Sequence, residues 1–391
     1  MSAVAVAAIL LFVAAASIAL LTFGPAASES RVLTAYTWRI LQFTLLQASL
    51  STLLSLGLAI PVALAIARRP QFPGRIWILR LMALPMGLPV LVVSLGVIAV
   101  WGRQGLANSL LLALGASEPV SIYGLSGILL AHVFFNLPLA CRLIVAELER
   151  LPNEYWKLAA GLGMNSLAIL RFIEAPAAVR VLPGIAGLVF MLCATSFTIV
   201  LVLGGGPAAT TLEVAIYQSL RFDFDPHRAI ALSLMQITLT TLILALLGIL
   251  HRPDDKAVTL SAPTRRFDGM SLLARTWDLG VVLCAVIFLL LPLAAIVSSG
   301  LQADLLRLLA SEAFLNAAAT SAAIATTSAL LALSLSVMII AGRQAIADMP
   351  RLSTVARLHD SLLAGISSLV LLVPPIVLGS GWFLLLRPGG G

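Results

Sequence analysis

The chain has 391 residues, of which 60% are apolar and only 10% are charged. Soluble domains are about 25% charged, so this composition excludes a water-soluble globular protein. The net charge of +7 does not indicate nucleic-acid binding, because the basic residues do not cluster as a nucleic-acid-binding face requires.

Long apolar segments recur along the chain. A helix of about 20 apolar residues can cross a bilayer with its backbone groups hydrogen-bonded internally. We therefore predict an all-α, polytopic transmembrane bundle of about nine spans. In chain order, the predicted spans are 3–23, 40–67, 78–101, 122–146, 182–203, 228–250, 277–299, 313–341 and 361–386.

The basic residues are distributed unevenly between the two predicted sides of the membrane. If the N-terminus is cytoplasmic, 17 of the 24 Lys and Arg residues fall in cytoplasmic intervals. This bias agrees with the positive-inside rule. We expect the N-terminus and residues 251–276 to be cytoplasmic, and residues 204–228 to lie outside.

Few side chains inside the predicted spans suggest chemistry. Cys141, Cys193 and Cys284 lack metal-binding spacing, and we interpret all three as buried small apolar residues. His132 and Asn136 lie one helical turn apart, where they either line a polar path or link helices, and we favour the link. No cofactor or metal site is predicted.

The polar interval 251–276 divides the chain into two predicted halves, 1–250 and 277–391. The second half partly repeats the first: Ala67-Arg68 corresponds to Gly342-Arg343 at the end of a predicted span, and a segment around Pro89 corresponds to one around Pro375. Six spans precede the second copy, so both copies point the same way. We predict a tandem parallel repeat whose second half is incomplete.

Sequence motifs also limit the function. Lys157 and Lys256 are the only lysines, and neither belongs to a phosphate-binding Gly-rich loop, so no intrinsic ATPase is predicted. No HExxH or GxSxG motif is present. We expect a transport protein rather than an enzyme.

The segment 151–184 is predicted to form a short amphipathic helix pair on the cytoplasmic side. Asn153 can cap its first helix, whose first turn holds Glu154. Gly161 and Gly163 end that helix, Asn165 or Ser166 starts the second, and Pro176 stops it. An apolar stripe at helical spacing on the first helix suits docking in a groove of another protein. The stripe consists of Tyr155, Leu158, Ala159 and Leu162.

This segment resembles the EAA loop of ATP-binding cassette (ABC) importer permeases, whose pattern is Glu-Ala-Ala-x3-Gly-x9-Ile-x-Leu-Pro. Ala159, Gly163, Ile173 and Pro176 stand at matching positions, whereas Lys157, Leu158 and Ala175 depart from the pattern. The resemblance implies ATP hydrolysis on a separate ABC ATPase dimer, and a periplasmic substrate-binding protein as a further partner. The implied ATPase-docking residues are Glu154, Lys157, Leu158, Ala159, Ala160, Gly163, Ile173 and Pro176.

Over most of its length the chain is similar to the fused two-half permeases of the iron(III)/thiamine branch. Residues 204–229 look like the outer loop of the thiamine permeases of that branch, which implies thiamine and its phosphates as cargo. The implied location is the bacterial inner membrane. Because such permeases continue to a second EAA loop, the resemblance also implies C-terminal truncation.

Three other functions are compatible with a chain of this composition: an iron(III) importer permease, a secondary transporter that needs no ATPase, and a membrane scaffold without transport. A secondary transporter would usually carry ionisable groups buried within its spans, and the sequence is poor in them. The spacing of the EAA-like loop favours the importer over the secondary transporter and the scaffold.

Overall fold

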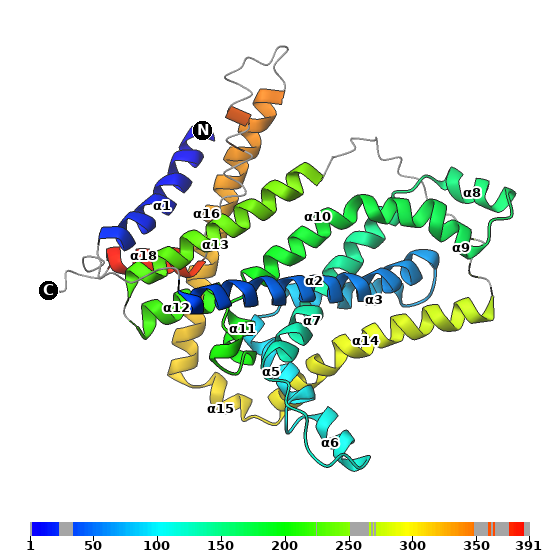
Figure 1. The fold of residues 1–391 in the computed structure, drawn as a ribbon, viewed down its shortest axis with the longest axis horizontal. Coiled ribbons are helices and arrows are strands. Elements are labelled where there is room, and N and C mark those ends of the chain that lie inside the picture. Colours follow the sequence, from blue (N-terminus) through cyan, green and yellow to red (C-terminus); the bar gives the residue numbers. More distant parts are fainter. Residues whose placement is uncertain are drawn as a thin grey trace. The chain divides into compact units, whose positions relative to one another are not determined.

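The computed structural model describes residues 2–22, 34–223, 225–250, 266, 269, 271–347, 359, 360, 363 and 375–386. Within these residues the regular structure is entirely helical (Figure 1), which confirms the predicted fold class. Seven stretches are long and apolar enough to cross a membrane: Ser2–Ala19, Ala35–Arg68, Val90–Ala113, Leu125–Glu149, Ser166–Ala194, Leu272–Leu301 and Glu312–Ile346.

The principal helices agree with most of the predicted spans. They are α1 (Ser2–Thr22), α2 (Ala35–Arg68), α5 (Val90–Trp101), α7 (Leu125–Glu149), α10 (Ala175–Ala194), α13 (Pro226–Leu250), α14 (Leu272–Leu301) and α16 (Glu312–Ala347). The predicted span 228–250 corresponds to α13, which is not among the seven stretches above. Most of the predicted span 361–386 lies outside the described residues, apart from Leu363 and α18 (Pro375–Leu386).

Shorter helices connect these elements. They are α3 (Arg75–Leu81), α4 (Leu84–Gly87), α6 (Leu106–Ala113), α8 (Asn153–Gly161), α9 (Ser166–Ile169), the π-helical segment η1 (Leu170–Glu174), α11 (Thr198–Leu203), the 3-10 turn η2 (Pro207–Ala209), α12 (Leu212–Arg221) and α15 (Leu305–Leu309).

The chain divides into two compact units. One consists of residues 35–214 and 241–299, and the other of residues 1–34, 215–240 and 300–391. In the first unit α2, α7 and α10 pack side by side (Figure 1). Their shared core contains Ile66, Ile128, Phe134 and Ile144, all fully buried.

Buried polar side chains also join these helices. The hydroxyl of Ser51 on α2 lies 2.8 Å from Nδ1 of His132 on α7. Gln47 donates from Nε2 to the backbone oxygen of Cys193, and Asn136 donates from Nδ2 to the Cys193 sulfur. His132 and Asn136 therefore link helices, which was the favoured interpretation.

In the other unit α1 packs against α16 and α18. The ring of Trp382 on α18 stacks on Phe12 of α1 with centroids 5.0 Å apart. Its indole N–H donates to the backbone oxygen of Phe12 at 3.2 Å. Gly381 also lies close to the backbone of Ala16, so the lack of a side chain permits the close approach of α18 to α1.

Some predicted bounds were wrong. The predicted span 78–101 is broken, because Leu88 precedes a proline and takes an extended conformation (φ −90°, ψ 142°), and α5 begins at Val90. Helix α16 continues past Gly342 and Arg343 to Ala347, although a helix end was expected there. Cys284 is exposed rather than buried, because it lies off the face of α14 that carries the buried residues Val282, Ala285 and Leu289.

Candidate functional site

Segment 151–184 begins with the predicted amphipathic helix, α8. Glu154 lies in its first turn, as predicted. Asn153 is not the N-cap, however. Pro152 occupies that position in an extended conformation and accepts a hydrogen bond from the N–H of Tyr155 at 3.1 Å, so Asn153 becomes the first helical residue.

Helix α8 ends in a Schellman motif at Gly163. The N–H of Met164 donates to the Ala159 oxygen at 3.0 Å, and the N–H of Gly163 donates to the Ala160 oxygen at 3.1 Å. Gly163 has a φ of +62°, a conformation that glycine adopts without steric cost. Two residues later, the side chain of Asn165 caps α9 by accepting from the N–H of Ala168 at 2.9 Å.

The second helix does not stop at Pro176, contrary to the prediction. Helical structure runs from Ser166 to Ala194 through the π-helical segment η1. In η1 the N–H of Ala175 donates to the Leu170 oxygen, five residues back. The missing N–H of Pro176 therefore falls where the hydrogen-bond register changes, and a proline is tolerated there. The loop thus continues into the membrane helix α10 without a break.

Segment 151–184 has two helical arms, α8 and the run from α9 through η1 into α10. The two arms enclose a surface cavity of about 260 Å³. The predicted stripe of Tyr155, Leu158, Ala159 and Leu162 forms one wall, and Ile173 and Pro176 lie on the opposite wall. Leu158 is 63% exposed and Leu162 is 69% exposed, whereas Ala159 is only 2% exposed. Large apolar side chains held open to solvent around a hollow are typical of a protein-docking surface.

Four of the predicted docking residues therefore meet at this cavity: Leu158, Ala159, Ile173 and Pro176. The other four are exposed and do not line it. They are Glu154, Lys157, Ala160 and Gly163.

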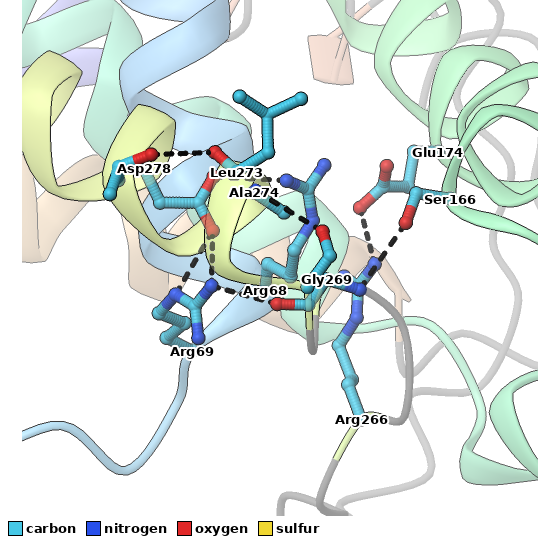
Figure 2. A network of polar contacts seen from close by, with 11 residues as sticks. Arg68, Arg69, Ser166, Glu174, Arg266, Gly269, Leu273, Ala274 and Asp278 are labelled. Carbon is cyan, nitrogen blue, oxygen red and sulfur yellow. Dashed lines mark hydrogen bonds and ion pairs between the residues drawn. The ribbon is translucent and has the colours of Figure 1, made fainter.

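A polar network behind the loop was not predicted (Figure 2). Arg266 pairs with Glu174 of η1 at 2.7 Å, and both side chains are almost fully buried. The Arg266 guanidinium also lies 4.0 Å from the ring centroid of Trp156 on α8. The network joins residues far apart in sequence. The one local signal was an acid, Asp278, inside the predicted span 277–299.

Asp278 forms the second part of this network. Its carboxylate is 3% exposed and accepts hydrogen bonds at 2.9 Å from Arg68 and from Arg69, which flank the end of α2. Gly269 lies between the two parts. Its N–H donates to the Ser166 hydroxyl at 3.2 Å, and its oxygen accepts from Arg69 at 3.0 Å.

The comparisons with known proteins identify this all-helical membrane protein as a transport permease. The family model described as binding-protein-dependent transport system inner membrane component matches residues 57–253. This chain belongs to that family.

Among the curated relatives, the thiamine transport system permease protein ThiP of Brucella abortus (strain 2308) is 50% identical over 352 residues, which cover 90% of this chain and 63% of the relative. The protein of the same name from Escherichia coli K12 is 42% identical over 357 residues, 90% of this chain and 64% of the relative. The chain thus spans less than two thirds of the length of these relatives.

A solved structure shares the fold. It is described as a crystal structure of a bacterial ABC transporter involved in the import of the acidic polysaccharide alginate. The match has a TM-score of 0.53 at 15% identity and covers 63% of this chain and 92% of that chain. At this identity the likeness concerns the fold alone.

Proposed function

We propose that this protein is a membrane permease of an ABC importer for thiamine and its phosphates. The observation that carries the proposal is the 50% identity, over 90% of the chain, to a relative named as a thiamine transport permease. In the proposed orientation, the N-terminus and segment 151–184 are cytoplasmic in the bacterial inner membrane.

The cavity of segment 151–184 supports the proposal that an ABC ATPase drives transport. An ABC ATPase dimer would insert an apolar side chain between Leu158 and Ile173, which face the same hollow. Because α9, η1 and α10 form one continuous helical run, movement of the loop reaches the membrane helix directly. Closure of the ATPase dimer would rock the permease between outward-open and inward-open states. A periplasmic binding protein would deliver the cargo from the other side.

The test of cargo is uptake of radiolabelled thiamine in cells that lack their own thiamine permease and carry this protein with its ATPase and binding protein. We expect uptake to require both partners, and to be inhibited by thiamine pyrophosphate but not by iron(III). Uptake that persists without the ATPase would instead indicate a secondary transporter. Inhibition by iron(III) alone would indicate the iron branch.

The test of docking is Leu158→Asp, which puts a charge into the apolar hollow. We expect at least a tenfold loss of ATPase co-purification, equivalent to about 1.4 kcal/mol. The matched control is Leu114→Asp, since Leu114 is 76% exposed and lies in the interval 102–121 between predicted spans, on the opposite predicted side. The control should insert and bind the ATPase normally. Normal ATPase binding by Leu158→Asp would contradict the docking proposal.

A further inference from the structure

Three residues connect segment 151–184, the end of α2 and the start of α14 within one compact unit. They are Arg266, Gly269 and Asp278, here called the strap. Arg266 contacts both arms of the docking loop, through Trp156 on α8 and Glu174 on η1. Gly269 bridges Ser166 at the start of α9 and Arg69 beyond the end of α2. Asp278 lies in the second turn of α14 and holds Arg68 and Arg69.

The two carboxylates and Arg266 in the strap contacts are shielded from water. Arg266 and Glu174 have side-chain exposures of 4% and 0%, and Asp278 is 3% exposed. Buried ion pairs contribute little net stability, because the cost of removing both charges from water offsets their attraction. The geometry of these ion pairs fixes the position of the loop, and removing one partner leaves the other as an unpaired buried charge. The strap therefore favours one placement of the loop against α2 and α14.

Gly269 shows how closely the parts fit. It has a φ of +73°, and a Cβ built on it would lie 2.5 Å from Cδ of Arg68. A side chain at this position would displace the arginine that binds Asp278. The backbone of Gly269 is therefore packed directly against Arg68 at the end of α2.

Resting on the function proposed above, we propose that the strap couples the ATPase-docking loop to α2 and α14, with Arg266 as a positioning residue that holds both arms of the loop. Because α10 continues from the loop, movement of the loop is transmitted along α10. The strap transmits the same movement to two other helices, through Arg266 and Gly269. It reaches the end of α2 and the start of α14. Loss of Arg266 should then separate ATP hydrolysis from transport without removing the apolar docking surface.

The experiment uses the permease with its ATPase and binding protein in lipid nanodiscs and proteoliposomes. Three quantities are measured: ATPase binding, ATP hydrolysis with and without loaded binding protein, and thiamine transported per ATP. For Arg266→Ala we expect ATPase binding within twofold of wild type, and at least a fivefold loss of thiamine transported per ATP. Arg266→Lys, which keeps the charge but not the planar stack on Trp156, should recover part of the loss.

Two further variants separate coupling from folding. Ser166→Ala removes the hydroxyl that accepts from the Gly269 N–H, and it should lower transport per ATP by about twofold while the protein folds normally. Arg275→Ala is the matched control, because Arg275 is exposed on α14 three residues before Asp278. It should behave as wild type in all three measurements.

The double variant Arg266→Ala with Glu174→Ala gives the decisive comparison. If the pair acts as one unit, the double variant loses no more coupling than the worse single variant. Additive losses of transport per ATP in the double variant would contradict the coupling role of the strap. Wild-type coupling in both Arg266→Ala and Ser166→Ala would also contradict it. If the wild-type protein itself shows no ATP-driven thiamine transport, the proposed function fails instead, and the two failures are thus distinguishable.

Discussion

At the scale of single residues, one buried carboxyl group makes the stability of the protein depend on pH. Glu213, in the first turn of α12, is 1% exposed, and its Oε1 has no hydrogen-bond partner among the described residues. It lies outside the seven candidate spans. Burial raises the pKa of this carboxyl from 4.5 to about 8. The folded protein therefore favours a protonated Glu213.

This raised pKa predicts a pH-dependent stability. Between pH 4.5 and pH 8 the unfolded chain has released the proton of Glu213 while the folded chain retains it. Stability should therefore fall as pH rises through this interval, by on the order of 1 kcal/mol per pH unit. Thermal melts in detergent from pH 5 to pH 8.5 measure the slope. Glu213→Gln should flatten it, whereas the exposed-site control Glu118→Gln should not. Equal slopes in all three proteins would contradict the prediction.

The local geometry of segment 151–184 was predictable from the sequence. The stripe of Tyr155, Leu158 and Leu162 follows from helical periodicity, and the turn at Gly163 follows from the conformational freedom of glycine. The pairs Arg266–Glu174 and Arg68–Asp278 join residues separated by 92 and 210 positions. No spacing rule relates such positions, so only the folded chain reveals them.

At the scale of elements, apolar length predicted where helices form, because lipid leaves the backbone no other structure. It did not predict where helices break or continue. The extended Leu88 before Pro89 breaks one predicted span, whereas Pro176 sits inside a continuous helical run. The difference arises from η1, whose altered hydrogen-bond register has no signature in the apolar pattern. Proline alone therefore does not define a helix end in this protein.

Close packing of α5 against α14 gives a prediction at this scale. A Cβ at Gly96 of α5 would lie 2.7 Å from Cδ1 of Ile296 and 2.8 Å from the backbone oxygen of Pro292. Gly96→Ala should push the helices apart and cost about 1–3 kcal/mol of stability. The comparison is Gly280→Ala on α14, where a Cβ meets nothing within 4 Å. That variant should be neutral or slightly stabilising in a detergent melt. Equal melting temperatures for both variants would show that the contact is unimportant.

At the scale of the whole molecule, the tandem-repeat organisation remains a prediction. The polar interval 251–276, which the sequence presents only as a divider, contributes Arg266 and Gly269 to the docking-loop network.

The distribution of basic residues predicts the membrane orientation of the protein. Lys and Arg near span ends are retained on the cytoplasmic side, and 17 of the 24 fall there if the N-terminus is inside.

The test replaces Cys141, Cys193 and Cys284 with alanine and adds single cysteines. Ser117→Cys and Ala208→Cys should react with a membrane-impermeant maleimide added outside intact cells. Ala160→Cys in the docking loop and Ser261→Cys in the interval 251–276 should react only after the membrane is opened. The two pairs control each other, since a leaky membrane would label all four sites. Labelling of Ala160→Cys and Ser261→Cys from outside, with Ser117→Cys and Ala208→Cys protected, would reverse the orientation. It would also place the docking loop where no ATPase can reach it.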